Sequence, residues 1–88
     1  MCALPKKNEE PIIVPEDDIS AMRRIVGRNI KHYRESLGVS QERLARSVGS
    51  SVSAVSKWEQ GQSIPSSEYV LALCKIFGCS PRDLFDGI

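Results

Sequence analysis

Between residues 37 and 80, serines and glycines recur at intervals that match the length of a short helix. Serine is favoured at the N-terminal cap of a helix, and glycine is favoured at the left-handed residue that follows a helix. Because residues 16–88 show no alternation of apolar and polar positions, nothing in this range predicts a strand. The sequence therefore predicts an all-α fold. We expect helices over Gln41 to Val48 and over Val52 to Gln60, which are the second and third of the chain. A fourth helix would run from Ser66 or Ser67 up to Gly78, and Ser80 would open a last helical turn.

A longer helix is expected before this region, from about Asp17 to Leu37. Its apolar positions recur at spacings of three and four, which places them on one face. The two aspartates Asp17 and Asp18 suit a helix N-terminus, where negative charge is favoured. We allow for a break near Gly27, because glycine costs about 1 kcal/mol relative to alanine inside a helix. The expected inward face consists of Ile19, Met22, Val26, Ile30, Tyr33 and Leu37.

The fourth helix is nearly all apolar, so we expect it to be the central buried one. After it, Ser80, Pro81 and Asp83 supply a cap, a proline at the first helical position and a capping-box acid. These signals bring the expected number of helices to about five.

A length of 88 residues fits one domain. Residues 1–15 hold three prolines, clustered charges and a single apolar patch at Ile12, Ile13 and Val14, so we expect an extended N-terminal arm followed by a domain over residues 16–88. No apolar run is long enough to span a membrane, and the first ten residues lack the apolar centre of a signal peptide. We therefore expect a cytoplasmic protein that does not enter a membrane.

The sequence offers no catalytic or metal-binding pattern. Three cysteines, Cys2, Cys74 and Cys79, form no CxxC pair, and His32 is the single histidine. Neither a disulfide framework nor a zinc site is indicated. We expect Cys74 and Cys79 to be small apolar core residues, and the alternative is that they form a redox switch. With no nucleophile–base pair and no glycine-rich phosphate loop, we expect no enzyme, no cofactor and no metal.

Charge is divided unevenly along the chain. Residues 1–18 carry two basic and five acidic residues, whereas residues 19–88 carry ten basic and six acidic, a net charge of +4. A basic surplus of this kind is expected of a phosphate-binding face, although a solvated surface also shows it. The same two interpretations stay open for Arg23, Arg24 and Arg28.

The segment from Gln41 to Gln60 has the pattern of two short helices that cross at a tight turn. Such helices need a small residue where they approach and a glycine at the corner, which Ala45 and Gly49 supply. Four apolar residues would fix the pair to the domain: Leu44, Val48, Val55 and Trp58. This arrangement leaves Val52, Ser53, Ser56 and Lys57 facing outward on the second helix.

These residues resemble the helix-turn-helix proteins of the phage-repressor and Cro-like type, also called the xenobiotic-response-element type. The likeness covers about residues 25–85. It is carried by Ser40-Gln41-Glu42-Arg43-Leu44-Ala45, by Gly49, by the run from Ser51 to Gly61, by Pro65, and by Gly78-Cys79-Ser80-Pro81-Arg82-Asp83-Leu84-Phe85. The resemblance implies a compact five-helix, lambda-repressor-like domain that binds double-stranded DNA in a sequence-specific way and regulates transcription, most often as a repressor.

The same resemblance implies roles for individual residues. Gln41 would contact a phosphate and brace the recognition helix, Gln60 would contact a second phosphate, and Arg43 would contact phosphate or base. The positions used for base edges match Val52, Ser53, Ser56 and Lys57, with Ser51 at the start of that helix. Val52 replaces a long polar residue of some members, and Ser50 replaces an aliphatic one, which would loosen the turn.

Arg34 and Glu59 occupy positions that pair in some relatives, so we expect a partly buried ion pair with a structural role. The alternative is that Arg34 contacts phosphate while Glu59 is solvated.

Because single modules of this type pair across half-sites, we expect a homodimer. Its contacts would come from the last helix with Leu84 and Phe85, from the first helix, or from the arm. The alternative function is an antitoxin-like or phage-regulator interaction module whose N-terminal arm binds a partner protein. The acidic residues at 9–18 and the apolar patch of the arm fit that alternative.

Overall fold

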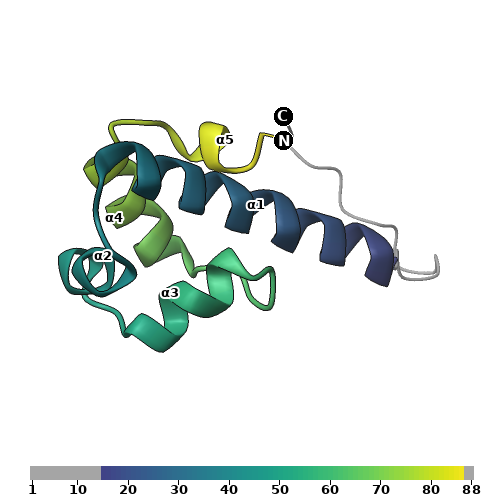
Figure 1. Ribbon diagram of the computed structural model, residues 1–88. Coiled ribbons are helices and arrows are strands. Elements are labelled where there is room, and N and C mark those ends of the chain that lie inside the picture. The colour runs from purple at the N-terminus through teal and green to yellow at the C-terminus, as the bar shows by residue number, and fades with distance from the viewer. Residues whose placement is uncertain (1–14, 87–88) are drawn as a thin grey trace.

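The computed structural model describes residues 15–86, and all the regular structure in this range is helical (Figure 1). The predicted arm therefore lies, apart from Pro15, outside the described residues, as does Cys2. The helices are α1 (Glu16–Leu37), α2 (Gln41–Val48), α3 (Val52–Glu59), α4 (Ser67–Phe77) and α5 (Pro81–Leu84). Their limits fall within a residue or so of the predicted ones, and the all-α fold is confirmed.

Local capping explains where the short helices begin and end. The hydroxyls of Ser40 and Ser51 accept hydrogen bonds from the backbone N–H groups of Arg43 and Ala54, both at 3.1 Å. Before α5, the backbone N–H of Ser80 donates to the Asp83 carboxylate at 3.0 Å, which is half of a capping box. These bonds satisfy donors that the first turn of a helix leaves without partners.

The core lies where α1 is packed against α3, α4 and α5, so α1 is the central helix. The expectation that α4 would be the central buried helix is correct only in part, because α4 packs against α1, α2 and α5 but is not buried all round. Only one side of α4 faces the core, and Leu71 on its outer side is 59% exposed. The fully or nearly buried apolar residues are Val26, Ile30, Leu44, Ala45, Val55, Trp58, Val70, Leu73, Cys74 and Leu84.

The inward face of α1 is shorter than its apolar periodicity suggested. Val26 and Ile30 are fully buried, but Met22 is 40% exposed and Leu37 is 50% exposed. In Figure 1 the first turns of α1 extend beyond the other helices, so no other helix within residues 15–86 covers them. A repeat of apolar residues marks the face of a helix, but the neighbouring helices decide how far along that face is covered.

Gly27 does not break α1, contrary to the expectation, because the helix runs without interruption through this residue. The glycine is instead required by a close approach of α3. A Cβ atom placed on Gly27 would lie 2.2 Å from the backbone carbonyl oxygen of Trp58. The missing side chain therefore lets the end of α3 rest directly on the backbone of α1.

Asn29 on α1 holds α5 in place, a role that the sequence did not reveal. This residue is buried, with 2% of its surface exposed to solvent. The Nδ2 amide donates to the backbone carbonyls of Leu84 at 2.9 Å and Asp86 at 2.8 Å, with Asp83 O more distant at 3.4 Å. These carbonyls follow a single helical turn and would otherwise lack donors. Asn29 thus ties the end of the described chain to the central helix.

Candidate nucleic-acid interface

The two crossed helices α2 and α3 form the unit that the sequence predicted. Leu44 and Ala45 of α2 and Val55 and Trp58 of α3 are all buried at their junction with the core. The turn between them closes with a hydrogen bond from the N–H of Ser50 to the carbonyl of Ala45 at 2.9 Å. The backbone of the turn is therefore hydrogen-bonded with serine at position 50.

The side of α3 opposite Trp58 faces solvent. Val52, Ser53 and Lys57 are exposed there, and Ser56 is half-buried. Lys57 and Ser53 lie four residues apart and therefore share a face of the helix. α3 thus presents a short row of small and basic side chains, supported from behind by the core.

Ser56 belongs to a chain of hydrogen bonds at the end of α3. The Gln60 amide donates to the hydroxyl of Ser56 at 3.0 Å, and the Gln62 amide donates to Gln60 Oε1 at 2.9 Å. These hydrogen bonds hold the three polar side chains in place at the edge of the exposed face of α3. Gln62 was missed at the sequence level, because its place depends on how the backbone turns after α3.

Glu59 joins three helices through its carboxylate. Oε2 accepts from Arg34 Nε at 2.6 Å, and Oε1 accepts from Arg34 Nη2 at 3.1 Å and from Gln41 Nε2 at 2.9 Å. The side chains of Arg34 and Glu59 are only 13% and 4% exposed, so the ion pair is screened little by water. The hydrogen bond to Glu59 is the largest influence on Arg34 and raises its pKa, against the opposing effect of burial.

This arrangement fixes the direction of α3. Arg34 belongs to α1 and Gln41 to the first turn of α2, while Glu59 is the last residue of α3. A third nitrogen of Arg34, Nη1, donates to the carbonyl of Val39 at 2.9 Å, so all three guanidinium nitrogens donate within the protein. Gln41 therefore braces α3 through its side chain, and Arg34 is directed toward the protein.

The remaining predicted residues lie at the edges of the same surface. Arg43 is exposed on α2, and Ser51 is exposed at the N-terminus of α3, where its hydroxyl caps the helix. Arg24 of α1 comes next to Gly61, since a Cβ placed on that glycine would lie 3.2 Å from Arg24 Cγ. α1 thus brings an exposed basic residue close to the end of α3. The long sequence separation between these residues concealed that placement.

No group of three or more histidine, cysteine, aspartate or glutamate side chains within residues 15–86 is arranged to hold a metal ion. None of the helices described is long and apolar enough to cross a membrane.

The sequence matches the helix-turn-helix family over residues 30–84, and the chain belongs to this family. Among its relatives, the repressor protein C2 of Salmonella phage P22 is 38% identical over 64 residues, which are 73% of this chain and 30% of the relative. The HTH-type transcriptional regulator DicA of Escherichia coli K12 is 38% identical over 62 residues, or 70% of this chain and 46% of the relative. The chain thus spans less than half the length of these two proteins.

A solved structure gives the same result for the fold. The crystal structure of the P22 c2 repressor in complex with a synthetic operator is similar with a TM-score of 0.68 and 38% identity, over 72% of this chain and 96% of that one. This similarity confirms the predicted likeness to phage-repressor domains.

Proposed function

We propose that this chain binds double-stranded DNA in a sequence-specific way and regulates transcription, with α3 in the major groove. One observation carries the proposal: an exposed polar face of a short helix is held rigidly by a buried three-residue network. The major groove admits an α-helix and displays a distinct donor and acceptor pattern for each base pair. The operator complex of the related P22 repressor supports the same assignment. The proposal assigns no catalytic role to any residue.

Each exposed residue of α3 suits a particular contact. Lys57 carries donors for guanine O6 and N7, and the methyl groups of Val52 suit the methyl group of thymine. Ser53 and Ser56 can donate to or accept from a base edge. We assign these four residues to base recognition.

The flanking residues suit the phosphate backbone. Arg43, Gln41, Gln60 and Arg24 surround α3 and present side-chain N–H donors, and contacts of this kind fix the position of a protein on the duplex. Ser51 lies at the N-terminus of α3, where the free backbone N–H groups and the helix dipole attract phosphate. We assign these residues to positioning.

Lys57→Ala tests the assignment of base recognition. We expect binding to the preferred site to weaken by about 1–3 kcal/mol, while binding to random duplex changes little. The preferred site would first be selected from a random duplex library, and affinities would then be measured by fluorescence anisotropy over a salt titration. Lys75→Ala is the matched control, because Lys75 is exposed on α4 and carries the same charge. Equal losses on specific and random duplex would refute the assignment.

Gln41→Ala tests the combined bracing and phosphate role. Because Gln41 donates to Glu59 as well as lying at the edge of the site, we expect affinity to fall for all sequences by a similar factor. Anisotropy with the preferred site and with shuffled sites measures this. A loss confined to one base position would contradict the role.

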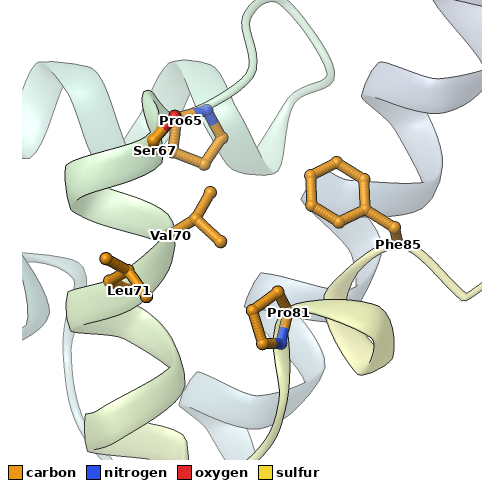
Figure 2. Close-up of a pocket in the computed structure, with 6 residues that line it drawn as sticks. All are labelled: Pro65, Ser67, Val70, Leu71, Pro81 and Phe85. Atoms are coloured by element: carbon orange, nitrogen blue, oxygen red, sulfur yellow. The ribbon is translucent and has the colours of Figure 1, made fainter. Parts of the chain in front are cut away.

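We further propose that the protein acts as a homodimer, because one short helix contacts few base pairs and such modules pair across half-sites. Figure 2 shows a candidate contact surface, a hollow of about 400 Å³ between α4 and α5. Leu71 is 59% exposed and Phe85 37% exposed at its edges, whereas Leu84 is fully buried in the core and cannot reach a partner. The hollow is lined by Pro65, Ser67, Val70, Leu71, Pro81 and Phe85.

Sedimentation of the wild type and of Leu71→Glu, with and without operator duplex, tests this surface. We expect the wild type to occupy the operator as a dimer and the variant to bind as a monomer with lower affinity. Met22→Glu tests the first helix as the alternative contact surface, because Met22 is also an exposed apolar residue but lies on α1. Loss of dimers in Met22→Glu alone would place the contact on α1. Dimers of undiminished stability in Leu71→Glu would exclude the surface.

Binding of a partner protein through the N-terminal arm stays a separate prediction. Deleting residues 1–15 tests it, because loss of partner capture with intact operator binding would support that role. Joint loss of dimerisation and operator binding would place the arm in the dimer instead.

A further inference from the structure

Two cysteines lie at the C-terminal end of α4, where the chain turns at Gly78. Cys74 precedes this glycine and Cys79 follows it. Gly78 is left-handed, with a φ of 70°. The backbone N–H of Cys79 donates to the carbonyl of Cys74 at 3.0 Å, and the N–H of Gly78 donates to the same oxygen at 2.9 Å. The bond from the sixth residue to the first is the defining feature of a Schellman motif, which brings the side chains at these two positions together.

In most proteins this side-chain contact is between two apolar residues, but here both are cysteines. Cys74 is 6% exposed, and Cys79 is half-buried. The 3.0 Å bond between their backbones brings the two side chains to the same side of the turn. Each thiol also influences the ionisation of the other. Tyr33 of α1 is stacked on Phe77 with ring centroids 5.2 Å apart, and its hydroxyl is one of the groups that influence the pKa of Cys79. The fold therefore brings two free thiols to a single turn at the end of α4.

We propose that Cys74 and Cys79 form a dithiol site that low-molecular-weight disulfides, such as oxidised glutathione, convert to an intramolecular disulfide. Cys79 is the more exposed of the two residues. Its thiolate attacks the glutathione disulfide, forms a mixed disulfide between Cys79 and one glutathione, and releases the other glutathione as its thiolate when the original S–S bond breaks. The thiolate of Cys74 then attacks the sulfur of Cys79, forms the Cys74–Cys79 bond and releases the second glutathione. Each protein thiol loses its proton to solvent and each released glutathione takes one up, so two protein thiols are oxidised and one glutathione disulfide is reduced.

The surroundings of the pair make this exchange slow at neutral pH. Burial raises the pKa of Cys74 to about 11, helped by the neighbouring Cys79 and by Asp83 of α5. The pKa of Cys79 is also raised, mainly by burial and also by Asp83, against hydrogen bonds from Cys74 and Tyr33 that lower it. Because the thiolate is the attacking species, the rate of closure rises with pH up to the pKa of the attacking thiol. The pair is therefore expected to respond to sustained oxidation.

Cys2→Ser protein, which retains only this pair, would be equilibrated in glutathione redox buffers, alkylated and examined by intact mass spectrometry with peptide mapping. We expect a species that has lost two hydrogen atoms, with the bond between residues 74 and 79. We expect the equilibrium constant for forming this disulfide from oxidised glutathione to be about tenfold or more higher in the folded protein than in the same chain unfolded in urea, because the fold holds the thiols together. An equal or lower constant in the folded protein would overturn the proposal, as would glutathione adducts in place of the closed disulfide.

A matched variant tests whether the Schellman motif promotes disulfide formation, or whether any two cysteines this close in the sequence would form the bond equally well. Cys74→Ala with Lys75→Cys keeps two thiols but moves one to an exposed position on α4. We expect this variant, checked for its helical circular dichroism, to close no better when folded than when unfolded. Closure as favourable as that of the original pair would show that the Schellman contact has no part in it.

Discussion

The close approach of α1 and α3 at Gly27 makes the replacement Gly27→Ala a demanding test of the fold. The added Cβ would lie 2.2 Å from the carbonyl oxygen of Trp58 and 3.1 Å from that of Glu59. Ordinary carbon–oxygen contacts begin at about 3.3 Å, so the two helices must separate by roughly 1 Å. Both oxygens belong to the backbone, and rotation of a side chain cannot relieve the overlap.

The expected loss can be worked out from two opposing effects. Extra atoms in a well-packed core typically cost about 1–3 kcal/mol, and a clash with rigid backbone belongs at the upper end, near 3 kcal/mol. Alanine is favoured over glycine in a helix by about 1 kcal/mol, which offsets part of this cost. We therefore expect Gly27→Ala to lower the free energy of unfolding by about 2 kcal/mol.

Urea unfolding followed by tryptophan fluorescence is a suitable assay. Trp58 is the single tryptophan of the chain and is 4% exposed, so its emission reports directly on the loss of packing beside Gly27. With an m-value near 2 kcal/mol/M, the midpoint would fall by about 1 M. The variants Lys31→Gly and Lys31→Ala change an exposed position of the same helix. The difference in their stability measures the preference of a helix for alanine over glycine without any packing effect. A Gly27→Ala protein as stable as the wild type would refute the packing argument.

Two further replacements test the buried polar contacts. Arg34→Met leaves the carboxylate of Glu59 without its charged partner, and we expect a loss of about 3 kcal/mol in urea unfolding; a double-mutant cycle with Glu59→Gln that gave no coupling would contradict the pairing. Asn29→Leu removes the donor for the carbonyls of Leu84 and Asp86, and we expect a loss of about 2 kcal/mol. Faster amide hydrogen exchange in α5 would accompany it, whereas unchanged exchange there would show that Asn29 does not hold α5.

The helix positions could be predicted from the sequence because their signals are local. A serine hydroxyl and the N–H group that it accepts from lie three residues apart, as at Ser40 and Ser51. The outward face of α3 followed in the same way from its periodicity, with Trp58 on the inside. Short-range rules of this kind need no knowledge of which helices meet.

The contacts that set the helices against one another could not be found in this way. Asn29 reaches carbonyls that lie 55 and 57 residues further along, and nothing beside it in the sequence distinguishes it from a solvated asparagine. Gly27 was recognised as unusual, but a glycine that weakens a helix and a glycine that admits a neighbouring backbone look alike in one sequence. Leu71 is as apolar as a core residue, and only the packing of α4 shows that it faces outward.

The network around Glu59 separates the task of folding from the task of recognition. Arg34 and Glu59 lie largely beneath the surface. Gln41 joins them from the edge of the site, whereas Val52, Ser53 and Lys57 contribute little to the interior. Exchanging these surface residues for others should leave the free energy of unfolding within about 0.5 kcal/mol. A single scaffold of this kind can therefore be reprogrammed for many target sequences, by selection or by design, without being rebuilt.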